Sequence, residues 1–393
     1  MSKKKILFVV PGLYSGGIRT SFLNLINQLE SDDSYNIDVL MFSDENKSLL
    51  PHWVNIIEPN DYLRLITTSH QKVCQKSKLL GFLRNIMGAV TKIFGSGVAY
   101  KFLFSTFKQL KGYDYAISFA QSGRRKSLYG GMNEFVLKKV DAKEKITFLH
   151  CDYEKCGIND NYSRKIYEKF DKIAAVSIGV KDVFLKCLPE LRDKVTVVHN
   201  CHQCERINEL STDNTVEYQK DAINFLTVAR ISAEKGHNRV LNVLEKLKKE
   251  GYRFFWHVVG GANSETEAAF LKSIDEKGLS DCVKLYGNQT NPYRFFVNAD
   301  ALLVASYHEA APMVYSEAEI LGLPVITTET ISSKEFIEDK NNGFVCKNDD
   351  NSLYEIMKEI LDSSHKLNCC REALNKECDF VESKNEFIKL LEN

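Results

Sequence analysis

The sequence predicts an α/β protein with two domains, each built around a parallel β-sheet. Short runs of β-branched and apolar residues alternate with helical patterns through the first half of the chain, which is typical of parallel strands joined by crossover helices. This pattern stops in the polar stretch after Asn200 and restarts at Ile223. A chain of 393 residues is also too long for one ordinary core, because domains usually have roughly 100 to 200 residues.

The first domain is predicted at residues 1–203, and its apolar runs mark the expected strands. In chain order these runs are Ile6–Val10, Ile37–Phe42, Val54–Ile57, Tyr115–Phe119, Ile146–His150, Ile173–Ser177 and Val195–His199. Sheets of this kind bind ligands beyond the carboxyl ends of their strands. We therefore expect two Rossmann-like domains that face each other across a cleft, with the chemistry at the strand ends.

Residues 204–221 are predicted to be a linker, and the second domain is predicted at residues 222–376. Its expected strands are Ile223–Ala229, Phe254–Gly260, Val283–Tyr286, Ala301–Ser306, Val325–Thr328 and Phe344–Cys346. The tail has a helical pattern from Phe380 to Leu391 and lies beyond the last strand signal. We expect residues 377–393 to form a C-terminal helix that crosses back to the first domain.

The composition excludes several classes of protein. With 44% apolar residues, 26% charged residues and 7 prolines, the chain is neither disordered nor fibrous. The 52 basic and 52 acidic residues cancel, so no overall charge favours a nucleic-acid partner. The 11 cysteines are scattered, and the start MSKKKILFVV has too few apolar residues for a signal peptide. No apolar run reaches the roughly 18 residues of a membrane span, so we expect a cytoplasmic protein with free thiols.

One segment departs from the overall charge balance. No acidic residue occurs between Asp61 and Asp114, where the average density predicts about seven, and nine lysines and arginines do occur there. Two apolar faces repeat at helical spacing within it, and they comprise Leu79, Leu83, Ile86, Val90 and Ile93, then Tyr100, Leu103, Phe104, Phe107 and Leu110. Basic amphipathic helices suit an anionic membrane surface, so residues 72–111 are a candidate for peripheral membrane contact. The alternative is that these helices only pack on the sheet.

Two glutamates stand eight positions apart near the end of a predicted strand. Glu309 lies in a loop after Ser306, and Glu317 lies inside a helix that Pro312 begins and Gly322 ends. Both carboxylates are therefore expected near the helix N-terminus, where backbone N–H groups can hold phosphates. This spacing predicts a sugar-nucleotide site in which one carboxylate binds a sugar and the other a ribose.

Two cations follow the first strand of the second domain. Arg230 and Lys235 lie in RISAEKG, at the predicted carboxyl end of that strand. Fixed cations beside a helix N-terminus would stabilise the charge that develops on a departing diphosphate. A surface cation pair is the alternative, because an arginine and a lysine at this spacing are common.

The first domain supplies two further candidates. Gly16 and Gly17 lie between the first strand and the first helix, where missing side chains would let a phosphate or sugar approach the backbone. His150 ends a predicted strand and would lie at the rim of the cleft. A plain turn and an ordinary packed histidine are the alternatives at these positions.

A metal site is not predicted. His199, Cys201, His202 and Cys204 contain a single C-x2-C pair, and Cys151 and Cys156 are remote as a complement. Closed zinc sites need four well-placed ligands, and cytosolic cysteines are usually inert packing residues.

Taken together, these motifs resemble the retaining glycosyltransferases of family 4, which have the two-domain GT-B fold. The resemblance covers nearly the whole chain, and its most specific element is Glu309-x7-Glu317. The supporting segments are VVPGLYSGG, ITFLHCDY, FDKIAAVSIGV, VTVVHN, FLTVARISAEKG, GNQTNPY and LGLPVITTE. The wording of ITFLHCDY and GNQTNPY is most similar to bacterial enzymes that build capsule, lipopolysaccharide or other surface polysaccharides.

The resemblance implies roles for the candidate residues. The second domain would bind a nucleotide-diphosphate sugar, with UDP as the expected carrier, and the first would bind the acceptor. Arg230 and Lys235 would hold the diphosphate, and Glu317 would bind the ribose hydroxyls. Glu309 would lie by the donor sugar, and His150 would contact the transferred sugar. Gly17 would close over the phosphates, with Gly16 beside it among the donor-binding residues, and the backbone N–H groups of Met313 and Val314 would meet sugar or phosphate.

The family acts as hexosyltransferases with retention, without a metal or a cofactor. The leaving phosphate helps to deprotonate the acceptor, so no side-chain nucleophile is assigned. A glycan or polyprenyl-linked acceptor at the inner face of the cell membrane would account for the basic helices.

Two positions depart from the family pattern. Glu309 is followed by Ala310 and Ala311 where the family has glycine, and Asn200 is followed by Cys201 where it commonly has glycine. The alternative functions are a non-catalytic GT-B module that partners another transferase, and a phosphorylase or epimerase of the same fold.

Overall fold

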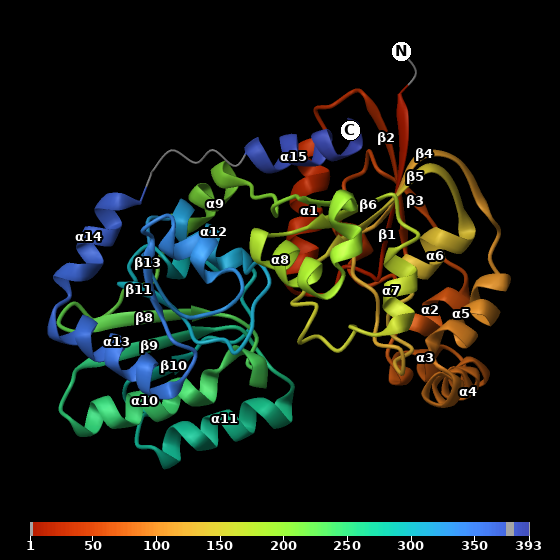
Figure 1. The fold of residues 1–393 in the computed structure, drawn as a ribbon. Coiled ribbons are helices and arrows are strands. Elements are labelled where there is room, and N and C mark those ends of the chain that lie inside the picture. Colours follow the sequence, from red (N-terminus) through yellow and green to blue (C-terminus); the bar gives the residue numbers. More distant parts are fainter. Residues whose placement is uncertain (1–2, 375–380, 393) are drawn as a thin grey trace. The chain divides into compact units, whose positions relative to one another are not determined.

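The computed structural model describes residues 3–374 and 381–392, which form two compact α/β units (Figure 1). Unit 1 runs to Cys201 and includes the C-terminal segment from Val381, and unit 2 begins at His202. The boundary expected between residues 376 and 377 lies outside the described residues. That the two domains face each other across a cleft stays a prediction.

Unit 1 has a seven-stranded parallel sheet in the order β3-β2-β1-β4-β5-β6-β7. The strands are β1 (Lys4–Val10), β2 (Tyr35–Met41), β3 (Asn55–Ile57), β4 (Leu110–Ser118), β5 (Val140–Leu149), β6 (Lys172–Ala175) and β7 (Val195–Val197). Residues Ile6 to Val9 have no exposed surface, as expected of a strand covered on both faces. The parallel sheet predicted for this half of the chain is confirmed.

The helices of unit 1 connect these strands, and four of them lie in one connection. They are α1 (Gly17–Leu29), α2 (Asp61–Thr67), α3 (His70–Lys76), α4 (Lys78–Phe94), α5 (Ser96–Ser105), α6 (Met132–Lys139), α7 (Asn161–Tyr167) and α8 (Ile178–Cys187), with short 3-10 turns at Lys47–Leu49 and Pro189–Lys194. Helices α2 to α5 gather together between β3 and β4 in the chain (Figure 1).

Two strands begin earlier than the sequence pattern indicates. β4 starts at Leu110 and β5 at Val140, whereas the apolar runs begin at Tyr115 and Ile146. Their extra residues pair with each other through Leu110 and Val140, with an irregularity before Tyr113. The exposed polar residues of these extensions hide the strands from an apolar pattern.

Unit 2 has a six-stranded parallel sheet in the order β10-β9-β8-β11-β12-β13, which confirms the second predicted sheet. The strands are β8 (Ile223–Val228), β9 (Phe254–Val259), β10 (Val283–Leu285), β11 (Ala301–Val304), β12 (Val325–Thr328) and β13 (Gly343–Cys346). The helices are α9 (Cys204–Ser211), α10 (His237–Lys249), α11 (Ser264–Glu276), α12 (Met313–Ile320), α13 (Asp350–Asp362) and α14 (His365–Ala373), with short turns at Ala233–Lys235 (η3), Tyr293–Phe295 (η4) and Lys334–Glu338 (η5). Helix α9 lies within the segment expected to be a linker.

The C-terminal helix α15 (Val381–Glu392) packs on unit 1. Phe387 is fully buried, with its ring 6.0 Å from that of Phe8 and 6.4 Å from that of Phe148. Tyr115 donates its hydroxyl hydrogen to the Leu391 carbonyl at 2.5 Å. The Glu386 carboxylate accepts from the His199 backbone N–H at 2.8 Å and lies 3.0 Å from its imidazole. These contacts tie the last helix to the central strands β1, β4 and β5 and to the segment after β7.

Nine cysteines of the described chain are free thiols, but Cys204 is disulfide-bonded, so the expectation of free thiols is wrong at that position. Within the described ranges, none of the helices combines the length and apolar character that crossing a membrane requires.

Candidate donor-binding site

Two loops of unit 2 meet at the carboxyl end of its sheet. β8 and β11 are neighbours, with Phe225 paired to Ala301, so the loops that follow them lie side by side. The Tyr307 N–H donates to the Glu234 carbonyl at 2.9 Å and joins the two loops directly. Residues separated by more than seventy positions in sequence therefore form one edge of the sheet.

Lys235 and Glu309 form an ion pair across these loops. The Lys235 Nζ lies 2.5 Å from Glu309 Oε1, and the Ser306 hydroxyl donates to the same oxygen at 2.6 Å. The two side chains are 24% and 10% exposed. The carboxylate is thus held in one orientation while the ammonium keeps donors for a ligand.

Gly236 allows this close approach. It has a φ of 71°, and a Cβ there would lie 1.9 Å from the Ala305 carbonyl oxygen. Only glycine fits a left-handed conformation in direct contact with a neighbouring strand end. The glycine therefore fixes the position of Lys235 at the start of α10.

Arg230 lies at the same edge but is less constrained. Its side chain is 65% exposed, and its guanidinium is 3.8 Å from the Glu234 carboxylate. Lys235 forms an ion pair with Glu309, whereas the Arg230 side chain extends into solvent, where its N–H donors are available to an anion. The structure therefore places both predicted cations at the strand end but gives them different partners.

Helix α12 begins directly after this loop. Met313 and Val314 are its first two residues. The N-cap residue Pro312 has an extended backbone and forms no side-chain cap to the helix. The first N–H groups of a helix have no intrahelical acceptor, and the helix dipole favours negative charge there. The helix start is therefore suited to a phosphate, and phosphate binding there stays a prediction.

Glu317 is buried one turn into α12. The Tyr293 hydroxyl, from η4, donates to Glu317 Oε1 at 3.3 Å. Burial raises the pKa of the Glu317 carboxyl to about 7, so near neutral pH it is divided between its two forms. A group in this state can both donate to and accept from a hydroxyl.

The alanines after Glu309 are compatible with the loop. Positive φ among non-glycine residues of the described chain occurs at Asn46, Asn214 and Asn341, so neither Ala310 nor Ala311 adopts a conformation that requires glycine. The same holds for the buried Cys201, whose carbonyl accepts from the Asn24 amide at 2.8 Å. Neither departure from the family pattern strains the backbone.

Two residues that support this edge were not predicted. Asn348 donates from its amide to the carbonyls of Ser306, Tyr307 and Glu329 at 3.3, 3.1 and 2.8 Å. Tyr293 orients Glu317. Tyr293 lies in GNQTNPY, which the resemblance singles out, but Asn348 lies in a polar KNDD stretch that carries no such signal.

The candidates of unit 1 lie on the corresponding edge of its own sheet. Gly16 caps α1 with a φ of 145°, a conformation that side chains rarely adopt, and Gly17 is the first residue of that helix. His150 follows β5, and its ring packs 4.9 Å from that of Phe119. Burial lowers the pKa of His150 to about 3, so its imidazole is neutral at physiological pH.

The segment with His199, Cys201, His202 and Cys204 contributes one contact to the packing of α15. His199 interacts with Glu386 as described above. Throughout residues 3–374 and 381–392, the structure contains no group of three or more histidine, cysteine, aspartate or glutamate side chains that could hold a metal ion.

Comparison with known proteins identifies the fold and the family that residues of unit 2 match. Anabaena HepE, solved in complex with UDP, superposes with a TM-score of 0.67 at 16% identity, covering 99% of each chain. The fold is therefore that of the GT-B glycosyltransferases. Residues 212–377 match the family described as Glycosyl transferases group 1, so the chain contains a domain of that family. This range includes every candidate residue of the donor-binding edge.

The curated relatives of this chain include an uncharacterized protein and a glycosyltransferase. A 41.2 kDa uncharacterized protein of the cps region of Klebsiella pneumoniae is 28% identical over 274 residues, which is 65% of this chain and 73% of that relative. The amylovoran biosynthesis glycosyltransferase AmsK of Erwinia amylovora is 30% identical over 136 residues, covering 33% of each protein.

Proposed function

We propose that this protein is a retaining glycosyltransferase that moves a sugar from a UDP-linked donor to a glycan or polyprenyl-linked acceptor in bacterial surface-polysaccharide synthesis. The observation that carries this proposal is the Lys235 and Glu309 ion pair beside the start of α12, within the group 1 domain. The UDP bound to HepE and the cps and amylovoran contexts of the relatives support the donor and the pathway class.

The proposed chemistry follows from the charges at this edge. As the bond between the sugar and the diphosphate breaks, negative charge grows on the leaving phosphate. Arg230, Lys235 and the N–H groups that begin α12 stabilise that charge more in the transition state than in the ground state. The acceptor hydroxyl forms the new bond on the same face of the sugar and passes its proton to the leaving phosphate. No metal and no side-chain nucleophile takes part in this scheme.

The remaining candidates have binding roles in the proposal. Glu309 accepts from hydroxyls of the donor sugar, and Glu317 binds the ribose. His150 would offer a hydrogen bond to the transferred sugar rather than a charge, because burial keeps it neutral. Gly16 and Gly17 would let phosphate approach the backbone.

We also propose that α4 docks the enzyme on the inner face of the cell membrane. The two apolar faces predicted between Asp61 and Asp114 differ in their exposure to solvent. Tyr100, Leu103 and Phe104 of α5 are buried, so this face packs in the core. In α4, by contrast, Leu79 and Ile93 are 75% and 72% exposed, and Phe82 and Phe94 are exposed beside them. An apolar helix face within a basic segment suits an anionic bilayer.

A donor screen tests the enzymatic proposal. Purified protein is incubated with UDP-linked and other nucleotide-linked hexoses and with lipid-linked glycan acceptors, and released nucleotide diphosphate is measured. Acceptor-dependent release of UDP, with the anomeric configuration of the donor retained in the product, is expected. If UDP binds but no acceptor causes UDP to be released from the donor, the non-catalytic module is favoured. A product with inverted anomeric configuration would contradict retention.

A further inference from the structure

Unit 1 contains a cavity of about 340 Å³ that none of the roles above uses. Its lining comes from the loop after β2 and from helices α2, α3 and α4. The lining residues are Ser43, Asp44, Glu45, Asn46, Asp61, Arg64, Leu65, Thr68, Lys72, Val73, Lys76 and Leu80. Small-molecule sites in proteins have volumes of about 300 to 1,000 Å³, so the space is large enough for a small ligand.

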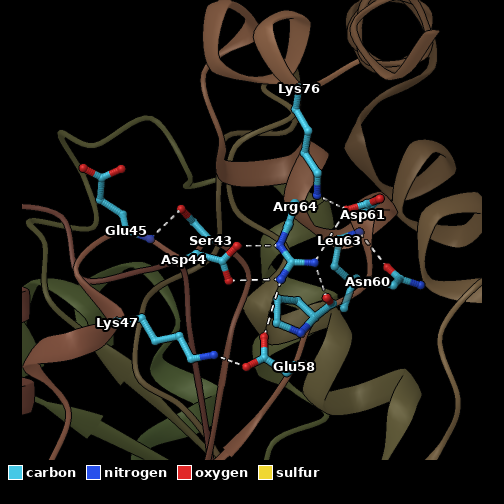
Figure 2. Close-up of polar contacts among 11 residues, drawn as sticks. Ser43, Asp44, Glu45, Lys47, Glu58, Asn60, Asp61, Leu63, Arg64 and Lys76 are labelled. Carbon is cyan, nitrogen blue, oxygen red and sulfur yellow. Dashed lines mark hydrogen bonds and ion pairs between the residues drawn. The ribbon is translucent and has the colours of Figure 1, made fainter. Parts of the chain in front are cut away.

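The charges around this cavity are matched. Three carboxylates, from Asp44, Glu45 and Asp61, face three cations, from Arg64, Lys72 and Lys76, so the lining has no net charge. Each cation is paired, as Figure 2 shows for Arg64 and Lys76. A lining with balanced charge does not select a phosphate or another anion, whereas it presents many donors and acceptors to a neutral polar ligand.

The Arg64 ion pair, whose guanidinium side chain is 22% exposed, holds part of the lining in place. Arg64 Nε lies 2.8 Å from one Asp44 oxygen and a terminal nitrogen lies 3.0 Å from the other, a two-point contact. Lys76 is 2.6 Å from Asp61, and Lys72 is 2.5 Å from Glu45. The hydrogen bond from Arg64 lowers the pKa of Asp44, so this carboxylate stays ionised at neutral pH. Donors and acceptors fixed before binding reduce the entropy that a ligand must overcome.

Apolar side chains complete the cavity. Leu65 and Val73 are buried, and Leu80 is half-buried at the start of α4. A sugar ring combines hydroxyls around its edge with an apolar face of C–H groups, and binding pockets commonly pair an apolar wall with a few fixed polar groups. The cavity offers both kinds of surface to such a ring.

We propose that this cavity binds a neutral sugar ring, and that the ring is a glycosyl residue of the acceptor. The second part rests on the proposed transferase function, but the first does not. Every lining residue belongs to unit 1, whereas Arg230, Lys235, Glu309 and Glu317 all belong to unit 2. The cavity follows the carboxyl end of β2, the sheet edge at which α/β domains bind ligands. Leu80 lines it while Leu79, its neighbour, belongs to the exposed apolar face of α4.

Saturation-transfer NMR on the full chain tests sugar binding directly. The probes are the methyl α-glycosides of glucose, galactose and N-acetylglucosamine, each at millimolar concentration. At least one should receive saturation from the protein, and the signal should fall at least five-fold in Glu45→Gln and in Lys72→Met. The control Asp33→Asn removes an exposed carboxylate paired with Lys3, outside the cavity, and should keep the full signal. No signal with any glycoside, or an undiminished signal in both cavity variants, would overturn the proposal.

Two further readouts separate the possible failures. Inorganic phosphate should not displace the glycoside, and displacement at equal concentration would contradict a neutral ligand. The melting temperature is measured with UDP in parallel. Glycoside binding without a UDP response would contradict the transferase and leave the sugar site in place. A UDP response without glycoside binding would contradict the sugar site alone.

The acceptor assignment is tested by kinetics. In the transfer assay, Glu45→Gln and Lys72→Met should raise the KM for the acceptor about ten-fold, a change expected when one or two hydrogen bonds to a ligand are lost. An unchanged acceptor KM in variants that no longer bind the glycoside would assign the cavity to a sugar other than the acceptor.

Discussion

The two units share the order of their first six strands, and one of the connections in which they differ is the one between the third and fourth strands. In unit 1 the first six strands lie in the order β3-β2-β1-β4-β5-β6, and unit 2 repeats this order as β10-β9-β8-β11-β12-β13. Between its third and fourth strands, unit 2 has only a loop and the short turn η4, whereas unit 1 has four helices, α2 to α5. The same place in the topology therefore carries different structures.

The two connections contribute to two different candidate surfaces, the donor-binding edge of unit 2 and the cavity of unit 1. The short connection of unit 2 brings Tyr293 to Glu317, at the candidate donor-binding edge. The long connection of unit 1 supplies most of the cavity lining and the exposed face of α4. In the proposals above, a shared sheet positions both ligand sites, and the connections decide what each would bind. Variants in unit 2 should accordingly impair turnover, whereas variants in the long connection of unit 1 should impair binding to the membrane or the acceptor.

The largest effect is expected from the ion pair of unit 2. Lys235→Ala and Glu309→Gln should each lower turnover by about 100-fold to 1,000-fold, because each group acts where charge develops. Steady-state assays with donor and acceptor measure this. Lys277→Ala is a matched control, since Lys277 pairs with Glu245 at 2.7 Å and both are about as exposed as Lys235. Near-normal rates in both site variants would contradict the site assignment.

Glu317 should make stability depend on pH. Its pKa is raised from an ordinary 4.5 to about 7, so the folded protein holds a proton that the unfolded chain has lost between these values. Stability therefore falls as pH rises through this window, by about 3 kcal/mol in total. Glu317→Gln should lack this loss. Denaturant unfolding of both proteins at pH 5 and pH 8 measures the difference.

A control for this comparison is Glu276→Gln, which removes an exposed carboxylate of α11 and should follow the wild-type dependence. Parallel curves for wild type and Glu317→Gln would show that the buried carboxyl does not titrate in this window.

A smaller effect is expected from the connection of unit 1. Phe82→Ser should lower the partition coefficient onto anionic vesicles about ten-fold, since part of an exposed phenylalanine would no longer enter the bilayer. Binding of the wild type should also rise with anionic lipid and fall with salt. Leu271→Ser is the control in unit 2, because Leu271 is 50% exposed on α11. Equal losses for both variants, or binding that ignores lipid charge, would contradict docking through α4.

Much of this architecture follows from local sequence pattern. Buried parallel strands are continuous apolar runs, so both sheets could be predicted. The start of α12 was marked by Pro312, and its end by Gly322. The extensions of β4 and β5 could not be predicted, because their exposed residues are polar and their pairing is not local.

The site was predictable only in part. Arg230, Lys235, Glu309 and Glu317 follow strand ends, where α/β proteins gather ligand-binding residues. Their partners are set by tertiary structure. No spacing in the sequence predicts the ion pair between Lys235 and Glu309 or the hydrogen bond from Asn348 to the Ser306 carbonyl. The exposure of α4 was likewise open, since an amphipathic pattern does not say whether its apolar face is covered. The structure decides this in favour of exposure for α4 and burial for α5.

The central claim is that unit 2 binds a nucleoside diphosphate through Lys235. The most direct test is the melting temperature of the wild type and of Lys235→Ala at rising UDP concentration. A ligand at about 100 times its Kd stabilises the folded state by about 2.7 kcal/mol, so the wild-type temperature should rise by several degrees. Lys235→Ala should need a much higher UDP concentration for the same rise. An equal response in both proteins, or none in the wild type, would contradict the account.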